Sequence, residues 1–222
     1  MGKYSKFNPG ASVTQHRQYW VTRSEECGKS GVRHAFHSPA AADAESELLK
    51  AKFTAELQQL HTDGALPARG TALDFGCGWG RWTGMLGDIV GSATGIDISP
   101  SYIAGSNATA STQFKLLRDP LAPLPVGSNS IDLLFTCTVL QHLVRDELLA
   151  HIVAEFKRVL RPHGVVFIFE CMDDAFRDKP HIAFRPFAEY ARLFNYAGLA
   201  EKWELIIRGE RHVLAIGRTG AA

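Results

Sequence analysis

The stretch that decides the fold is Thr71-Ala72-Leu73-Asp74-Phe75-Gly76-Cys77-Gly78-Trp79-Gly80. Its first half is short and apolar, which predicts a buried β-strand over residues 71–75. Its second half has glycine at alternate positions, which lets a backbone turn tightly and approach a ligand closely. A helix is expected over residues 81–90, and the free N–H groups at its start suit a carboxylate. The stretch therefore predicts a strand, a ligand-binding turn and a helix.

The chain after Pro67 continues this alternation of short apolar runs and helical stretches. Further strands are expected at residues 114–117, 131–136 and 165–169, and the second apolar run, which ends at residues 95–98, predicts another strand. Further helices are expected at residues 99–108, 146–160 and 186–196. Near-continuous apolar runs are typical of strands buried on both faces of a parallel sheet, and a βαβα order predicts a doubly wound sheet. Residues 199–207 and 211–217 predict a closing hairpin around Gly209. We therefore expect an α/β, Rossmann-like, mostly parallel seven-stranded sheet with an antiparallel C-terminal hairpin strand and helices on both faces.

The first 40 residues differ in texture from the rest. They are polar, contain Asn8-Pro9-Gly10 and Ser38-Pro39, and predict an irregular arm with one short helix near residues 14–24. From Pro39 to about Leu60, apolar residues recur at helical spacing and predict an amphipathic helix. We expect residues 1–40 to form a helical arm or lid and residues 41–222 to form the α/β domain.

Composition and charge exclude several classes of partner. The 222 residues are 45% hydrophobic and carry a formal net charge of +1, so bulk electrostatics favours neither nucleic acid nor an acidic membrane as a partner. No apolar run approaches the ~18–20 residues that span a bilayer, and the N-terminus has no signal-peptide pattern. The four cysteines form no CxxC pair, so no metal site is expected. We expect a cytoplasmic protein, a monomer or homodimer, with a small-molecule substrate.

An acidic residue follows the glycine turn at an informative distance. Asp97 ends the second predicted strand, 23 positions beyond Asp74. A carboxylate at the tip of this strand accepts hydrogen bonds from both hydroxyls of a ribose. The alternative is that Asp97 caps the helix that begins near Ser99, although Ser99 is itself a suitable cap.

Four segments in the same order resemble motifs of the class I S-adenosylmethionine-dependent methyltransferases. The glycine turn has the GxGxG spacing of this family, rather than the GxGxxG of dinucleotide-binding proteins. The segment Arg118–Leu121 is similar to the one after the family's third strand. Residues 131–143 resemble its fourth-strand motif, and residues 156–164 its "RVLRPGG" turn, where His163 replaces the first glycine. The resemblance is strong over about residues 70–170 and is closest to methyltransferases with small-molecule acceptors.

The resemblance implies S-adenosylmethionine as cofactor and gives roles to individual residues. Asp74 would hold its ammonium, Asp97 the ribose and Asp119 the adenine amine. The remaining predicted cofactor-binding residues are the loop Gly76, Cys77, Gly78 and Gly80 along the methionine half, Ile98, Pro120 and Leu121 around the adenine, and Thr136 and Cys137, whose backbone faces the amino-acid tail. We interpret the side chains of Cys77 and Cys137 as small packing residues.

The arm resembles the opening of some small-molecule methyltransferases, where this segment folds over the cofactor. Tyr19 and Trp20 are the candidates for an aromatic face over the sulfonium, an attraction of about 0.5–2 kcal/mol. Trp20 is also weighed as a mere anchor of the arm. Arg23 and Arg33 are candidates for binding a carboxylate by a two-pronged contact, against the alternative of solvated surface arginines.

His142, after the fourth strand, is the preferred general base. The catalytic candidates are His142 and the two aromatic residues of the arm, Tyr19 and Trp20. The other candidates are Glu170, His34, His37, Asp173, Asp174 and His181. A base is required only if the acceptor must lose a proton before it attacks the methyl group.

Three functions are compatible with these features. The first is methyl transfer to a small-molecule acceptor at N, O or C, in a biosynthetic setting such as secondary metabolism. The second keeps fold and cofactor: the methionine amine attacks its own γ-carbon, which releases methylthioadenosine and forms azetidine-2-carboxylate. The third is a cofactor-binding module without catalysis.

Overall fold

A computed structural model describes residue 10 and residues 12–32, 38–173 and 181–220. Within these residues one seven-stranded sheet has the order β3-β2-β1-β4-β5-β7-β6. Its strands are β1 (Gly70–Phe75), β2 (Gly91–Asp97), β3 (Thr112–Leu116), β4 (Ile131–Cys137), β5 (Leu160–Cys171), β6 (Ala200–Ile207) and β7 (Glu210–Arg218). Strands β1 to β5 are parallel, and β7 pairs antiparallel with both β5 and β6. The predicted fold class is confirmed.

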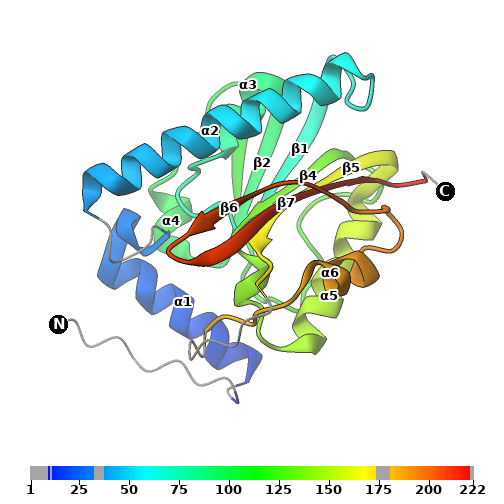
Figure 1. Cartoon of the computed structure of the whole chain (residues 1–222). Helices are drawn as coiled ribbons and strands as arrows, with labels where there is room; N and C mark the ends of the chain where they lie inside the picture. Colours follow the sequence, from blue (N-terminus) through cyan, green and yellow to red (C-terminus); the bar gives the residue numbers. More distant parts are fainter. Residues whose placement is uncertain (1–9, 11, 33–37, 174–180, 221–222) are drawn as a thin grey trace.

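Helices cover both faces of the sheet, as Figure 1 shows. One face packs against α2 (Pro39–Thr62) and α3 (Thr83–Val90), and Phe53 of α2 touches the rings of Phe135, Phe167 and Phe169. The other face packs against α5 (Asp146–Val159) and α6 (Phe187–Leu193). The strand order reverses between β1 and β4, and ligands of open α/β sheets bind beside the carboxyl ends of the strands at such a point.

The arm is more regular than its polar sequence predicted. Helix α1 (Val13–Cys27) starts with a capping box between Ser12 and Gln15, and a 3₁₀ turn, η1 (Gly28–Val32), follows it. The helix packs beside α4 (Pro100–Ala104), where the hydroxyl of Ser24 lies 2.5 Å from that of Ser99. Tyr102 of α4 donates its hydroxyl to the carbonyl of Gly28 at 3.0 Å. Helix α1 is thereby fixed beyond the carboxyl ends of the parallel strands (Figure 1).

Several predicted boundaries require correction. The helix expected over residues 99–108 ends at Ala104, because Gly105 closes its last turn with backbone hydrogen bonds to the carbonyls of Ser101 and Tyr102. The helix expected over residues 186–196 covers only Phe187–Leu193, and the one expected from residue 81 begins at Thr83. The third strand is shifted toward the N-terminus by two residues at its start. Helix ends and short strands carry weak periodicity, which explains these differences.

The residue that departs from the family motif occupies a demanding turn. His163 has a φ of 65°, a left-handed conformation that a residue with a β-carbon adopts at a cost of about 1–2 kcal/mol. Its carbonyl accepts a hydrogen bond from Nε of Arg218 at 3.0 Å. The family pattern has glycine at this position because glycine adopts a positive φ without this cost. The change to His163 lies at a turn and not among the candidate ligand-binding residues.

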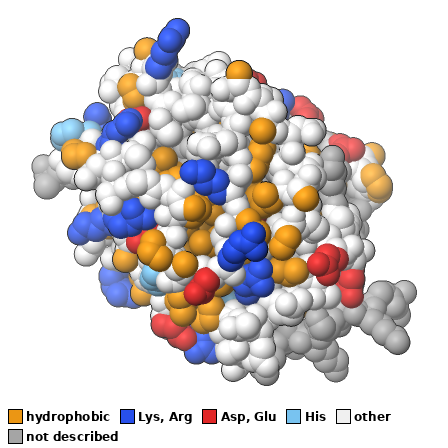
Figure 2. Space-filling view, turned by 180° about the vertical axis from the view of Figure 1, so that it is seen from behind, with side chains coloured by type: hydrophobic (Ala, Val, Ile, Leu, Met, Phe, Trp, Pro, Cys, Tyr) orange, Lys and Arg blue, Asp and Glu red, His pale blue; other side chains and the backbone are white. Residues whose placement is uncertain are grey.

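Charged side chains are mixed over the face opposite to the view of Figure 1. Figure 2 shows Lys and Arg side chains lying among acidic and hydrophobic ones on that face. This mixing agrees with the formal net charge of +1. In the part of the chain that the structure describes, no helix has both the length and the apolar character needed to cross a membrane.

Candidate functional site

The glycine loop after β1 is folded back on the end of β2. The N–H groups of Gly76 and Cys77 both donate to the carbonyl of Ile96, at 2.8 and 3.1 Å. Gly76 has a φ of 72°, and a β-carbon placed there would lie 2.4 Å from Cγ2 of Val139. Gly80 has a φ of 90° and would meet the ring of Phe114 at 2.7 Å. The loop conformation therefore requires glycine at both positions.

Asp97 is a structural partner of this loop. Its Oδ2 accepts the N–H of Gly78 at 2.9 Å, and its Oδ1 accepts the N–H of Ser99 at 2.8 Å. The side chain of Ser99 itself caps α4 by accepting from the N–H of Tyr102. The backbone of Ile98 also bonds this carboxylate. A carboxylate has about four lone-pair sites, so Asp97 keeps acceptor capacity for a ligand. Burial raises the pKa of this carboxyl.

Asp74 lies buried at the carboxyl end of β1, with 1% of its surface exposed. Its Oδ2 accepts a hydrogen bond of 2.6 Å from the hydroxyl of Thr83, the first residue of α3. Burial raises the pKa of Asp74 to about 7, partly offset by this hydrogen bond. Asp74 therefore changes its charge near neutral pH.

The backbone after β4 is held by a buried carboxylate. Oε1 of Glu170 accepts the N–H groups of Val139 and Leu140, both at 3.0 Å, and Oε2 accepts that of Gln141 at 3.1 Å. Burial raises the pKa of Glu170 to about 7. These contacts fix the 3₁₀ turn η2 (Leu140–His142) against the end of β5 (Leu160–Cys171). Glu170, a candidate base by its sequence position, is engaged in positioning this turn.

Thr138, between β4 and this turn, has a φ of 56° although it is β-branched. Such a conformation costs of the order of 1–3 kcal/mol and occurs mostly at functional sites. It turns the chain so that Val139 packs over Gly76. Thr136 is fully buried just before it, and burial raises the pKa of the neighbouring Cys137 thiol to about 12. Burial likewise raises the pKa of Cys77, so both thiols are protonated at neutral pH.

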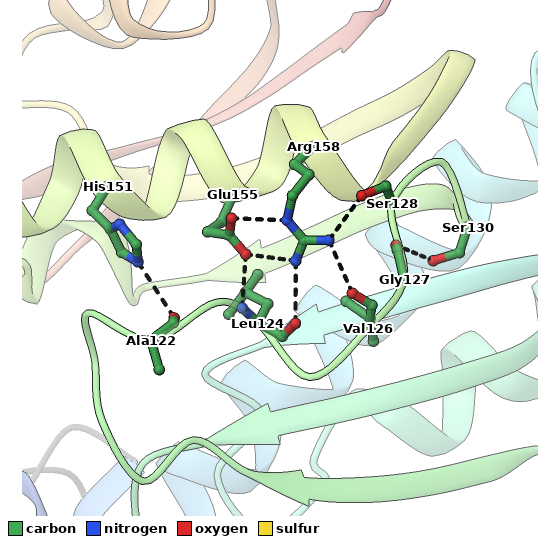
Figure 3. A network of polar contacts seen from close by, with 9 residues as sticks. All are labelled: Ala122, Leu124, Val126, Gly127, Ser128, Ser130, His151, Glu155 and Arg158. Carbon is green, nitrogen blue, oxygen red and sulfur yellow. Dashed lines mark hydrogen bonds and ion pairs between the residues drawn. The ribbon is translucent and has the colours of Figure 1, made fainter.

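The loop after β3, which carries the predicted adenine contacts, is tied to α5. Figure 3 shows Glu155 and Arg158 of α5 reaching into this loop. Glu155 accepts the N–H of Leu124 at 2.7 Å, and Nη2 of Arg158 bonds both Glu155 and the carbonyl of Leu124. His151 lies 3.3 Å from the carbonyl of Ala122. The hydrogen bond from Arg158 lowers the pKa of Glu155, which keeps this support charged.

Asp119 itself is exposed, and its Oδ1 accepts the N–H of Leu121 within the same turn. Leu121 has 44% of its surface exposed. The buried neighbour in this segment is Pro120, together with Leu117 just before it.

The arm brings a group of rings to the end of β4. The ring of Trp20 lies 4.6 Å from that of His142, and its Nε1 donates to Nε2 of His16 at 3.0 Å. Tyr19 packs edge-on against Trp20 at 5.0 Å. The rings of His142 and His181 are stacked at 5.8 Å. The preferred base and the two arm aromatics predicted from sequence are therefore neighbours.

His142 is held in a defined state. Its Nδ1 lies 2.8 Å from the carbonyl of His181, which can only accept, so Nδ1 carries the proton. Burial lowers the pKa of His142 to about 3, which makes the neutral imidazole a weak base at neutral pH. Burial also lowers the pKa of His16 to about 4. With the proton on Nδ1, the lone pair of His142 is on Nε2, and its role as a base stays a prediction.

Arg23 bonds within the arm. Its Nε donates to the carbonyl of Gly31 at 3.2 Å, and its guanidinium lies 5.9 Å from the ring of Trp20. Asp173, another candidate base, accepts the N–H of Arg211 at 3.3 Å. Arg33, His34, His37 and Asp174 lie outside the described residues.

A cavity of about 40 Å³ lies between α1 and the carboxyl ends of β1 to β3. It is lined by His16, Arg17, Trp20, Phe75, Ile98, Leu117, Pro120, Leu143, Leu148 and Ile152. Ile98, Pro120 and Trp20 were predicted from the sequence, whereas Asp119 and Leu121 are not among the lining residues. This volume is small for a nucleoside, so the cavity by itself does not hold the whole cofactor.

Sequence reasoning missed several residues of this site. Phe75, Leu117 and Leu143 have the pattern of ordinary core residues, and His16 and Arg17 lie in a segment of weak helical pattern. A larger hollow of about 200 Å³ lies between α2 and the end of the glycine loop, with Trp79 and Arg81 in its lining. Arg81 donates to the hydroxyl of Ser46 of α2 there, at 2.7 Å.

Comparison with known sequences identifies the central part of the chain. Residues 73–168 match the family model of the methyltransferase domain. The chain is 30% identical over 105 residues to the mouse tRNA (carboxymethyluridine(34)-5-O)-methyltransferase ALKBH8. These aligned residues are 47% of this chain and 15% of that protein. It is also 29% identical over 132 residues to a probable S-adenosylmethionine-dependent methyltransferase of Mycolicibacterium smegmatis. This alignment covers 60% of this chain and 49% of that protein. The matched region is thus half or less of each relative.

Solved structures share the fold over almost the whole chain. The [4+2]-cyclase SpnF superposes with a TM-score of 0.67 at 16% identity, over 96% of this chain and 98% of that one. The complex of DhpI with S-adenosylhomocysteine superposes with a TM-score of 0.64 at 20% identity, over 95% and 98%. The match of residues 73–168 and the two similar sequences identify this part of the chain as an S-adenosylmethionine-dependent methyltransferase domain, and the two solved structures share its fold.

Proposed function

We propose that this protein is an enzyme that transfers the methyl group of S-adenosylmethionine to a small-molecule acceptor. The observation that carries the proposal is the group of rings from α1 and η2, with Trp20 packed on His142, at the carboxyl ends of the strands. When bound, S-adenosylmethionine supplies a sulfonium whose methyl carbon is open to attack by a nucleophile held in line with it. A compact helix over this cleft favours an acceptor smaller than a macromolecule.

The residues at the cleft fit this cofactor. The loop at Gly76 and Gly80 brings bare backbone to the end of β1, where the methionine half would lie. Asp74 and Asp97 would hold its ammonium and its ribose, and the apolar side chains of Ile98 and Leu117 would contact the adenine. Helix α1 lines the small cavity at the strand ends through His16, Arg17 and Trp20, and we propose that residues 1–40 act as a lid.

A second candidate is favoured by the same closed geometry. With α1 seated on the strand ends, little room is left for a separate acceptor, which would suit attack by the methionine amine on its own γ-carbon. The carbon–sulfur bond would then break, methylthioadenosine would leave, and the amine would lose a proton to solvent. The similar fold of a [4+2]-cyclase illustrates that this architecture carries ring-forming chemistry in another protein.

The test is the nucleoside product. The protein is incubated with labelled S-adenosylmethionine, alone and with a metabolite extract, and the products are separated by chromatography. We expect S-adenosylhomocysteine, formed only when the extract is present. Methylthioadenosine from enzyme and cofactor alone would instead support cyclisation. Tight cofactor binding without either product would favour a non-catalytic binding module, and a product that persists in Asp97→Ala would have come from a contaminating enzyme.

The ionisation of Asp74 predicts a pH dependence of cofactor binding. Its pKa near 7 in the folded protein means that the ammonium of the ligand meets a charged carboxylate only above that pH. We expect the affinity for S-adenosylhomocysteine, measured by calorimetry, to rise roughly tenfold from about pH 6 to about pH 8. The raised pKa also makes the stability contribution of Asp74 largest at low pH and lost as pH rises from about 4 to about 7.

The control for this dependence is Asp74→Asn, which cannot ionise. Its affinity is expected to be weaker and nearly constant over the same range. An undiminished pH dependence in the variant would assign the titration to another group, of which Asp97 is the nearest candidate because it interacts electrostatically with Asp74.

The proposal extends to a cytoplasmic location, a biosynthetic role, and a monomer or homodimer that binds neither nucleic acid nor membrane. The near-neutral net charge and the mixed charges of Figure 2 support the last point. Because one relative is a tRNA methyltransferase, tRNA belongs among the acceptors tested.

A further inference from the structure

A cluster of metal-ligating side chains lies at the carboxyl end of β5, between β5 and β7. This is the edge of the sheet where the glycine loop follows β1, and β4 lies between β1 and β5. Cys171, Glu210 and His212 each place one ligand atom within 4.8 Å of the other two, and all three residues are buried. Cys171 and His212 are direct partners in the antiparallel register of β5 and β7. Glu210 lies two residues before His212 and so shares its face of the sheet.

The chemistry of this face changes abruptly at the cluster. Before it, β5 presents Val165, Phe167 and Phe169, and β7 presents Leu214 and Ile216, all buried against α2 and α3. At the next positions of the same face, a thiol, an imidazole and a carboxyl replace these apolar side chains. The cluster is therefore a local departure from the apolar packing of this face, and its three groups are of the types that bind transition metals.

The imidazole of His212 has the orientation of a ligand. Its Nδ1 lies 3.2 Å from the carbonyl of Glu210, an acceptor, so the proton is on Nδ1 and the lone pair is on Nε2. Metal-bound histidines are commonly oriented by such a hydrogen bond to a backbone carbonyl. The ring of Phe169 stacks on that of His212 at 5.7 Å and restricts its rotation.

We propose that Cys171, Glu210 and His212 form a zinc site that fastens the end of β5 to the start of β7. A thiolate and an imidazole favour Zn²⁺ over Mg²⁺ and Ca²⁺, which prefer oxygen ligands alone. On binding, Zn²⁺ displaces the thiol proton of Cys171 to solvent, and the thiolate and carboxylate together neutralise the charge of the ion. Zinc–ligand distances are about 2.0–2.3 Å, and the three ligand atoms lie within 4.8 Å of one another, close enough to surround one ion.

The ligands of this site come from two strands, and no local sequence pattern marks them. The absence of a CxxC pair led to the expectation of no metal. Register, rather than spacing, brings the three residues together.

The test is metal binding by the full chain after treatment with a chelator and dialysis. Zn²⁺ is measured by equilibrium dialysis with elemental analysis, and Co²⁺ is used as a spectroscopic probe. We expect stoichiometric Zn²⁺, a rise of several degrees in Tm, and a near-ultraviolet thiolate-to-Co²⁺ charge-transfer band. Cys171→Ser and Glu210→Gln should lose the bound metal and the rise in Tm, and Cys171→Ser should also lose the band.

Cys27→Ser is the matched control, since Cys27 lies on α1 outside the cluster and its variant should keep both metal and band. Retained binding of S-adenosylhomocysteine verifies that the cluster variants are folded. A wild-type chain that takes up no Zn²⁺ and shows no shift in Tm would overturn the site, as would undiminished binding in Cys171→Ser. In that case the three side chains would form only a buried hydrogen-bonded cluster.

Discussion

Replacing Asp97 with alanine is expected to weaken the binding of S-adenosylhomocysteine by about a hundredfold or more, since each hydrogen bond to a charged group contributes about 1.5–3 kcal/mol and two ribose hydroxyls lose their acceptor. The variant also removes the acceptor for the N–H groups of Gly78 and Ser99, so the loop loses its alignment with the end of β2. Calorimetry measures the affinity, and thermal unfolding without ligand measures the separate effect on the loop.

Asp97→Asn retains one acceptor oxygen and separates these effects. We expect it to bind with intermediate affinity. The N–H₂ group of asparagine cannot accept a hydrogen bond, so either a backbone N–H group of the loop or a ribose hydroxyl loses its acceptor. Asp88→Ala, on the exposed side of α3, is the matched control and should bind like the wild type. Unchanged affinity in Asp97→Ala would contradict the assignment of the ribose to this carboxylate.

Gly76→Ala should have the second large effect, a loss of about 2–5 kcal/mol in the free energy of unfolding, combining the left-handed backbone with a forced shift of a packed side chain. Its β-carbon would lie 2.4 Å from Cγ2 of Val139, and its φ is 72°. Because Val139 belongs to the segment held by Glu170, the displacement reaches the end of β4 and is expected to abolish cofactor binding as well. Urea unfolding followed by circular dichroism measures the loss.

Gly84→Ala is the control for this substitution. Gly84 lies in α3, and a β-carbon added there would meet no atom within 4 Å, so alanine should stabilise the helix by about 1 kcal/mol. The double variant Gly76→Ala/Val139→Ala should recover part of the stability, because it removes the clash but not the strained backbone. Equal stabilities of Gly76→Ala and Gly84→Ala would show that the packing over the loop is not as tight as the structure has it.

Much of the cofactor side of the molecule follows from local sequence. The alternation of apolar runs and helical stretches predicted a parallel sheet, since a strand buried on both faces must be apolar along its length. The glycines at 76, 78 and 80 predicted the turn, because their positions require φ values that other residues avoid. The position of Asp97 at the end of β2 likewise follows from its place after the strand.

Other parts depended on contacts between distant segments. The boundary of α4 is set by Gly105, and the strain at Thr138 is tolerated because Phe169 accepts its N–H and Glu170 holds the next turn. The expectation that His142 acts as a base rested on its position after β4. Burial beside Trp20 and His181 lowers the pKa of His142. This burial depends on the docking of α1, which carries Trp20, and on the segment at His181, 39 positions along the chain.

The sequence by itself thus determined the α/β sheet, the glycine loop and the identity of the residues around it, because periodicity and glycine act over a few neighbouring positions. Only the tertiary structure decided which segment lies over the ends of the strands and which polar groups meet elsewhere. The seating of α1 through Ser24 and Ser99 joins segments 75 positions apart. The cluster of Cys171 with Glu210 and His212 exists only through the register of β5 and β7. Such contacts are selected by the packing of the whole chain, and no local pattern encodes them.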